Sequence, residues 1–136
     1  MTVVESLATS LGRRDEIPNQ QLAQEIVDAH DGKAIDELIE NLSNKNKSIQ
    51  SDCIKVLYEV GERNPKLIAG NHNDFAKLLT SKNNRLAWGA MTALDSITAV
   101  NPKGVHSLLS QIIKAADSGS VISRDHAVGI LTKLAK

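Results

Sequence analysis

The sequence repeats itself with a period of 37 residues, and this repeat constrains the fold more than any other feature of the chain. Two Asn-Pro pairs, at positions 64 and 101, are separated by that interval. Small and apolar residues recur three and four positions apart, which is the spacing of one face of an amphipathic α-helix. The aligned sets are Cys53, Ala90 and Ala127; Ile54, Met91 and Val128; Leu57, Leu94 and Leu131; and Val60, Ile97 and Leu134.

The segment that precedes each of these helices repeats as well. The same shift aligns Leu38 with Phe75 and Ile112. Each unit is therefore predicted to contain an outer helix A and an inner helix B, joined by a turn rich in Ser, Asn and Gly. The turns are expected at 43–46, 81–84 and 117–120, and the helices at 2–11, 19–30, 33–43, 47–63, 65–80, 84–99, 102–116 and 121–135.

The two Asn-Pro pairs are predicted to start outer helices. Asn64 and Asn101 are expected N-caps, and the proline that follows each of them takes the first helical position, where its missing N–H costs no hydrogen bond. Gly70 is expected to weaken the helix at 65–80, because glycine is a poor helix former.

The composition agrees with an all-α fold. Only Tyr58, Phe75 and Trp88 are aromatic, whereas strands favour aromatic residues, and no segment alternates steadily between apolar and polar residues. The length of 136 residues fits one domain. We expect an α–α superhelix with a helical N-terminal cap over residues 1–31, which fit the repeat poorly, and three two-helix units over residues 32–136.

The sequence offers little chemistry for catalysis. Cys53 is the only cysteine and is predicted to be a core residue, because no basic neighbour or helix N-terminus is placed to stabilise a thiolate. The four histidines lack the spacing of a zinc site. Carboxylates such as Glu59 and Glu62 are interpreted as ordinary solvated helix faces. We therefore expect no catalytic residue, no metal and no cofactor, and hence not an enzyme.

The N-terminal residues predict a cytoplasmic location. They contain no leading positive charge and no apolar run of signal-peptide length, and no window approaches the roughly 18 apolar residues that a membrane span needs. No membrane partner is expected.

The inner-helix segments resemble HEAT repeats of the armadillo-type superhelix family. The resemblance is carried by 49–57 (IQSDCIKVL), 86–94 (LAWGAMTAL) and 123–131 (SRDHAVGIL), and it covers residues 32–136. Arg124 stands where such units often carry arginine, whereas the first two units have Gln50 and Ala87. The resemblance implies a superhelix whose inner helices line a concave binding face. It leaves the function open, because such repeats serve scaffolds, adaptors, enzyme subunits and some DNA-repair enzymes.

Trp88 is the strongest candidate for a contact residue. It is the only tryptophan, it adjoins Gly89, and Arg85 lies three residues earlier on the same helix face. The functional interpretation is an anchor pocket on the concave face formed by Trp88, Arg85, Thr92 and His126. The structural alternative is that Trp88 packs between the inner helices of neighbouring units, with its indole N–H bonded locally.

These observations favour a non-enzymatic scaffold or protein-interaction module that binds a protein or peptide. A HEAT-like DNA-binding or DNA-base glycosylase-type protein is the rival hypothesis, with Trp88, Arg85 and Asp125 in the aromatic, basic and acidic roles. The zero net charge argues against nucleic acid as a partner. A structural subunit of a larger assembly is a further alternative. Residues 1–65 carry a charge of −5 and residues 66–136 a charge of +5, so a homodimer and head-to-tail stacking both stay open.

Overall fold

The computed structural model describes residues 3–13 and 15–136 of the chain. Its regular elements are all helical, and no strand occurs among the described residues. The α-helices are α1 (Ile17–Ala29), α2 (Gly32–Glu40), α3 (Lys47–Arg63), α4 (His72–Ala76), α5 (Asn84–Ile97), α6 (Pro102–His106), α7 (Leu109–Ser118) and α8 (Val121–Leu134). The short 3-10 helices are η1 (Val3–Ser6), η2 (Asn41–Ser43), η3 (Pro65–Leu67) and η4 (Ala69–Asn71). The all-α prediction is confirmed.

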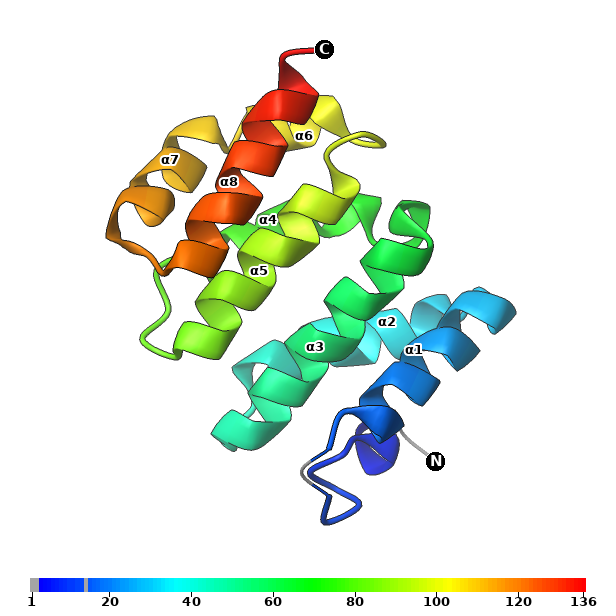
Figure 1. Cartoon of the computed structure of the whole chain (residues 1–136). Coiled ribbons are helices and arrows are strands. Elements are labelled where there is room, and N and C mark those ends of the chain that lie inside the picture. Colours follow the sequence, from blue (N-terminus) through cyan, green and yellow to red (C-terminus); the bar gives the residue numbers. More distant parts are fainter. Residues whose placement is uncertain (1–2, 14) are drawn as a thin grey trace.

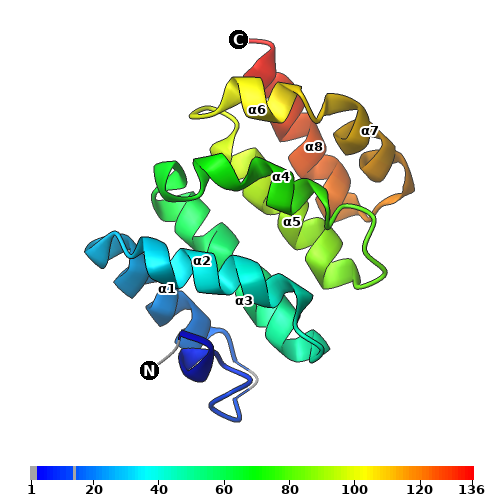
Figure 2. The ribbon, with the colours of Figure 1, turned by 180° about the vertical axis from the view of Figure 1, so that it is seen from behind.

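The helices form two layers. Helices α1, α3, α5 and α8 lie side by side in that order and make the inner-helix layer (Figure 1). Seen from behind, α2, α4, α6 and α7 make the outer-helix layer (Figure 2). Helix α1 occupies one end of the inner-helix layer and α8 occupies the other. Among the described elements, none covers the other face of the inner-helix layer (Figure 1).

The repeat fixes where the inner helices begin. Asn46, Asn83 and Ser120 are the N-caps of α3, α5 and α8, and each side chain accepts a hydrogen bond from a backbone N–H in the first turn. These three positions follow one another at the period of the sequence repeat. The predicted polar turns are therefore confirmed, because short polar side chains satisfy the N–H groups that a helix start leaves free.

The outer helices are shorter than the sequence predicts. The helix expected at 65–80 is divided into η3, η4 and the five-residue α4, and the helix expected at 102–116 is divided into α6 and α7. The breaks let Ile68 and Phe75, and likewise Val105 and Ile112, all point into the core. Gly70 lies within the first broken stretch, and glycine is a poor helix former, whereas the second break falls at Ser107 and Leu108, after Gly104. Packing of the apolar side chains decides the backbone path there.

One of the two predicted N-caps is confirmed and the other is wrong. The Asn101 side-chain oxygen Oδ1 accepts a hydrogen bond from the Gly104 N–H at 3.1 Å, and the side-chain amide donates to the Ala69 carbonyl at 2.7 Å. A Cβ at Gly104 would lie 2.5 Å from the Asn101 amide nitrogen, so this cap requires glycine there. Asn64 makes no such cap, because only a single 3-10 turn follows it.

The prediction of an N-terminal helix at 2–11 is also wrong for residues 3–11, while residue 2 lies outside the described residues. Only η1 is helical, and turns follow it up to Gly12, which has a φ of +70°. Backbone N–H groups of this segment bind side chains from α1, α2 and α3 instead of helical carbonyls. Leu7 and Ala8 are buried and fix the segment to the core.

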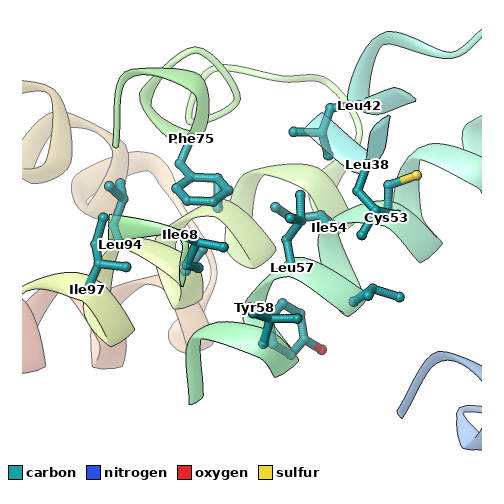
Figure 3. Packing of buried hydrophobic residues seen from close by; sticks show 14 of the residues in the cluster. Leu38, Leu42, Cys53, Ile54, Leu57, Tyr58, Ile68, Phe75, Leu94 and Ile97 are labelled. Carbon is teal, nitrogen blue, oxygen red and sulfur yellow. The ribbon is translucent and has the colours of Figure 1, made fainter. Parts of the chain in front are cut away.

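The core lies between the two layers (Figure 3). Leu38 from α2 and Phe75 from α4 meet apolar residues of the inner helices, among them Leu57 and Leu94. Cys53 is fully buried, as predicted, and burial together with the negative charges of nearby carboxylates raises the pKa of its thiol to about 12. Every helix in the described part of the chain is too short or too polar to cross a membrane.

Candidate functional site

A pocket of about 280 Å³ opens on the inner-helix layer between the start of α1, α3 and α5. Trp88 of α5 and Tyr58 of α3 form its aromatic wall, with ring centroids 6.1 Å apart and ring planes inclined by 45°. We call this space the Trp88 pocket. It is lined by Asp15, Glu16, Asn19, Ser51, Asp52, Ile54, Lys55, Tyr58, Arg85 and Trp88.

The backbone around Trp88 is held firmly. The Thr92 hydroxyl donates a hydrogen bond to the Trp88 carbonyl at 2.8 Å. A Cβ at Gly89 would lie 2.8 Å from Cγ1 of Ile54, so glycine here lets α5 approach α3 closely. The Trp88 side chain is half-buried and packs on the core. Trp88 therefore packs between neighbouring inner helices, as the structural alternative predicts. It also lines an open pocket, as the functional interpretation predicts.

Arg85 lies on the same side of α5 as Trp88. Its backbone N–H binds the capping Asn83 side chain at 3.1 Å, which fixes the first turn of the helix. Arg85 is exposed and lines the Trp88 pocket. The pairing of Arg85 with Trp88 that the spacing predicts is therefore found in the structure.

Thr92 and His126 do not share that pocket. They line a second hollow of about 290 Å³ near the other end of α5, together with Glu62, Asp95 and Lys133. Thr92 is buried and its hydroxyl is already bonded to the Trp88 carbonyl. The structure therefore divides the four predicted residues into two pairs. Arg85 and Trp88 lie in the first half of α5, whereas Thr92 lies one turn further along α5 and meets His126 of α8.

Asp95 joins α5 to α8 at the second hollow. Its carboxylate lies 2.8 Å from Nδ1 of His126 and 2.7 Å from Nζ of Lys133. The Lys133 ammonium also donates to the Asp95 carbonyl at 2.9 Å. A Cβ at Gly129 would lie 2.9 Å from the carboxylate. His126 thus connects two helices, a role the sequence analysis does not assign to it.

Glu59 lies in a buried ion-pair cluster, whereas the sequence analysis interprets it as part of a solvated helix face. It is buried, with 7 % of its surface exposed, and is not part of a solvated face. Its carboxylate lies 2.8 Å from Nζ of Lys55 and 2.6 Å from Nη1 of Arg63. The spacing of Lys55, Glu59 and Arg63, four residues apart, is the sequence signal that indicates this cluster.

Burial and the charged groups around Glu59 shift the pKa values of Glu59 and of two neighbouring residues. Burial raises the pKa of the Glu59 carboxyl, but hydrogen bonds from Arg63 and Lys55 outweigh it and hold the pKa below its ordinary value. Burial is the main cause that raises the pKa of Glu62, and the negative charge of Glu59 raises it further. Burial likewise raises the pKa of Tyr58, whose ring centroid lies 4.9 Å from Nζ of Lys55. These pKa shifts follow from burial and from the charges gathered along α3.

Asp52 ties the N-terminal segment to the edge of the Trp88 pocket. Its carboxylate accepts hydrogen bonds from the Thr9 N–H at 2.8 Å and from the Asn19 amide at 2.9 Å. Asn19 in turn accepts from the Ala8 N–H at 2.9 Å. Asp52 therefore supports one wall of the pocket.

Replacing Asp52 with alanine should release this segment. The change leaves the Thr9 N–H and the Asn19 amide without their acceptor, and an unsatisfied donor of this kind costs about 1–3 kcal/mol. We expect faster amide hydrogen exchange at Ala8 and Thr9 and a lower melting temperature. Asp36→Ala, an exposed change on α2, is the control; equal effects of both variants would contradict the role assigned to Asp52.

The rival glycosylase hypothesis needs an aromatic residue and a carboxylate in one site. Asp125, the carboxylate that the hypothesis assigns, is exposed on α8 and does not line the Trp88 pocket, whose carboxylates are those of Asp15, Glu16 and Asp52. Within residues 3–13 and 15–136, the His, Cys, Asp and Glu side chains form no group of three or more that could hold a metal ion.

Comparison of the sequence with family models and with curated proteins, and of the fold with solved structures, found no match to this chain. The structure defines an all-α protein of two helix layers, in which α3, α5 and α8 begin one sequence repeat apart.

Proposed function

We propose that this chain is a non-enzymatic, cytoplasmic protein-interaction module with a HEAT-like superhelical arrangement, and that it binds a protein segment on the inner-helix layer. The order α1, α3, α5 and α8, with inner-helix caps one repeat apart, supports the arrangement. The observation that carries the binding site is the half-buried Trp88 in an open pocket beside the exposed Arg85.

The chemistry of the Trp88 pocket suits side chains of a protein partner. Trp and Arg are the residue types that most often dominate binding energy at interfaces. A pocket of about 280 Å³ has room for one or two side chains of a partner. Glu16 and Arg85 place both charge signs at the rim, where they can orient a peptide without demanding a strongly charged one.

The site is preformed, which favours affinity. Thr92 bonds the carbonyl of Trp88, and Tyr58 supports the indole ring from α3. A partner therefore pays little to order this surface on binding. We restrict the proposed contact to Trp88 and Arg85. Thr92 supports Trp88 from within the helix, and a contact at His126 would require a partner long enough to reach the second hollow.

Alanine at Trp88 tests the proposal. In affinity capture from the lysate of the source cells, we expect the wild-type chain to retain a protein that Trp88→Ala retains at least tenfold less, because central tryptophans cost about 2 kcal/mol or more when truncated. Arg85→Ala should weaken the same interaction. Circular dichroism and thermal melting must first show that both variants are folded.

Trp88→Phe is the matched control, since it keeps an aromatic ring against Tyr58 and should keep most of the binding. Asp117→Ala, an exposed change on α7, should change nothing. If Trp88→Ala and the wild type capture the same proteins in the same amounts, the proposed site is wrong. An empty capture by the wild type would likewise contradict the interaction module and favour a structural role.

A further inference from the structure

A further hollow, of about 550 Å³, adjoins the Trp88 pocket at the edge of the inner-helix layer where α3 and α5 begin. Arg13, Lys47 and Arg85 are the basic side chains that line it, and Asp52 is the acidic one. We call this space the basic hollow. Ser51, Asp52 and Arg85 line both the basic hollow and the Trp88 pocket, so the two spaces are neighbours on one surface. Helices α3 and α5 run in the same direction, which brings their first turns together at this edge (Figure 1).

Two of the basic side chains in this hollow are available to a partner. Lys47 and Arg85 are exposed, and neither forms an ion pair with another described residue. Arg13, by contrast, pairs with Asp15 at 2.6 Å. The Asp52 carboxylate already accepts two hydrogen bonds from donors within the chain. The basic hollow therefore offers two cationic side chains to a negatively charged group, and hydrogen bonds between such ions are the stronger ones in proteins.

Helix stability does not explain why basic residues occupy these two positions. Lys47 is the first residue of α3 and Arg85 is the second residue of α5, and neither helix has an acidic residue in its first turn. The start of a helix carries a partial positive charge, which disfavours a cation there. Residues that oppose a local stability rule in this way are expected at functional sites.

We propose that the protein segment that binds at Trp88 carries a carboxylate side chain beside its apolar anchor, and that Lys47 and Arg85 hold this carboxylate in the basic hollow. The inference rests on the proposed function, because it names the chemistry of the partner at that same site. Arg85 lines both spaces, so it can bind the carboxylate while Trp88 contacts the anchor. Ser48 and Ser51 also line the basic hollow, and their hydroxyls can donate to the same group.

The charges of the adjoining Trp88 pocket favour such a peptide segment over nucleic acid. Asp15, Glu16 and Asp52 line that pocket beside Trp88. A strand of nucleic acid that continues from the basic hollow would bring its phosphates against these three carboxylates. A peptide has a neutral backbone, so it can place one carboxylate in the basic hollow and an uncharged side chain in the Trp88 pocket.

Random peptides of about twelve residues, displayed on phage, test both levels of the proposal. We expect the wild-type chain to retain peptides in which Asp or Glu flanks an apolar residue, and Trp88→Ala to lose them. A wild type that retains no peptide, or peptides that Trp88→Ala retains equally well, would contradict the proposed function and this inference with it. Retained peptides that depend on Trp88 but have no acidic residue would overturn this inference alone.

Reversing the charge at Lys47 tests the basic hollow directly. We expect Lys47→Glu to raise the dissociation constant of a retained acidic peptide at least tenfold, and Lys47→Gln to raise it by a smaller factor. The melting temperature of Lys47→Glu should equal or exceed that of the wild type, because a carboxylate suits the start of a helix. A loss of binding without a loss of stability therefore distinguishes a binding role from a structural one.

The matched control and the compensating change complete the test. Lys66→Glu makes the same change in charge on η3, beyond the other end of α3, and should bind the peptide as the wild type does. Replacing the acidic residue of the peptide with lysine should restore binding to Lys47→Glu and not to the wild type. Equal affinities of Lys47→Glu and the wild type, or equal losses in Lys47→Glu and Lys66→Glu, would overturn the inference. Tighter binding of a short DNA duplex than of any retained peptide would overturn it in favour of nucleic acid.

Discussion

Replacing Phe75 with alanine should lower the free energy of unfolding by about 3–5 kcal/mol, the largest effect that we expect of a single substitution. Phe75 is the largest fully buried side chain of the described residues. It comes from α4, which has five residues and is too short to be stable by its own hydrogen bonds. Its ring joins the buried cluster that includes Ile68 and Leu94 (Figure 3).

Urea denaturation followed by circular dichroism measures this effect. A domain of this size is stable by about 5–15 kcal/mol, so the loss shifts the urea midpoint strongly. Phe75→Leu keeps most of the buried volume and should cost much less. A loss below 1 kcal/mol for Phe75→Ala would show that α4 is not held to the inner helices by this side chain.

Replacing Glu59 with glutamine should cost about 2 kcal/mol near neutral pH. The change removes the charged acceptor of Lys55 and Arg63, and hydrogen bonds to charged groups contribute about 1.5–3 kcal/mol. Removing one member of a fully buried pair costs more, but the side chains of Lys55 and Arg63 are 17 % and 30 % exposed and can recover part of their hydration.

The same substitution should change how stability depends on pH. The folded-state pKa of Glu59 lies below its ordinary value, so its contribution is fully present above the ordinary pKa of glutamate and is lost as the pH falls through the folded value. The wild type should therefore lose stability in this acidic window, and Glu59→Gln should lose less. Unfolding free energies measured from pH 7 down to pH 3 test this difference.

Glu62→Gln is the matched control, because it removes an equal charge one turn away. The raised pKa of Glu62 means that its charged form is unfavourable in the folded protein. This variant should leave stability at neutral pH unchanged or slightly higher. If Glu59→Gln and Glu62→Gln destabilise the chain equally, the cluster of Lys55, Glu59 and Arg63 does not stabilise the fold as proposed.

The sequence by itself determined the all-α class and the starts of the inner helices. Short polar caps and helical periodicity are local signals, and Asn46, Asn83 and Ser120 carry them at each repeat. It also placed Trp88 beside Arg85, since residues three apart on a helix share a face whatever surrounds them.

Only the tertiary structure decided where the outer helices break, which path the N-terminal segment follows and which polar side chains are buried. The outer helices break where Ile68 and Phe75 both have to reach the core, and the N-terminal segment follows acceptors supplied by Asp52 and Asn19, far away in the sequence. The neighbouring elements in the fold likewise decide whether a helix face contacts another helix or solvent. The burial of Glu59 therefore cannot be predicted from the sequence of its own helix. Local patterns report the preferences of one segment, whereas burial and long-range hydrogen bonds depend on all the segments at once.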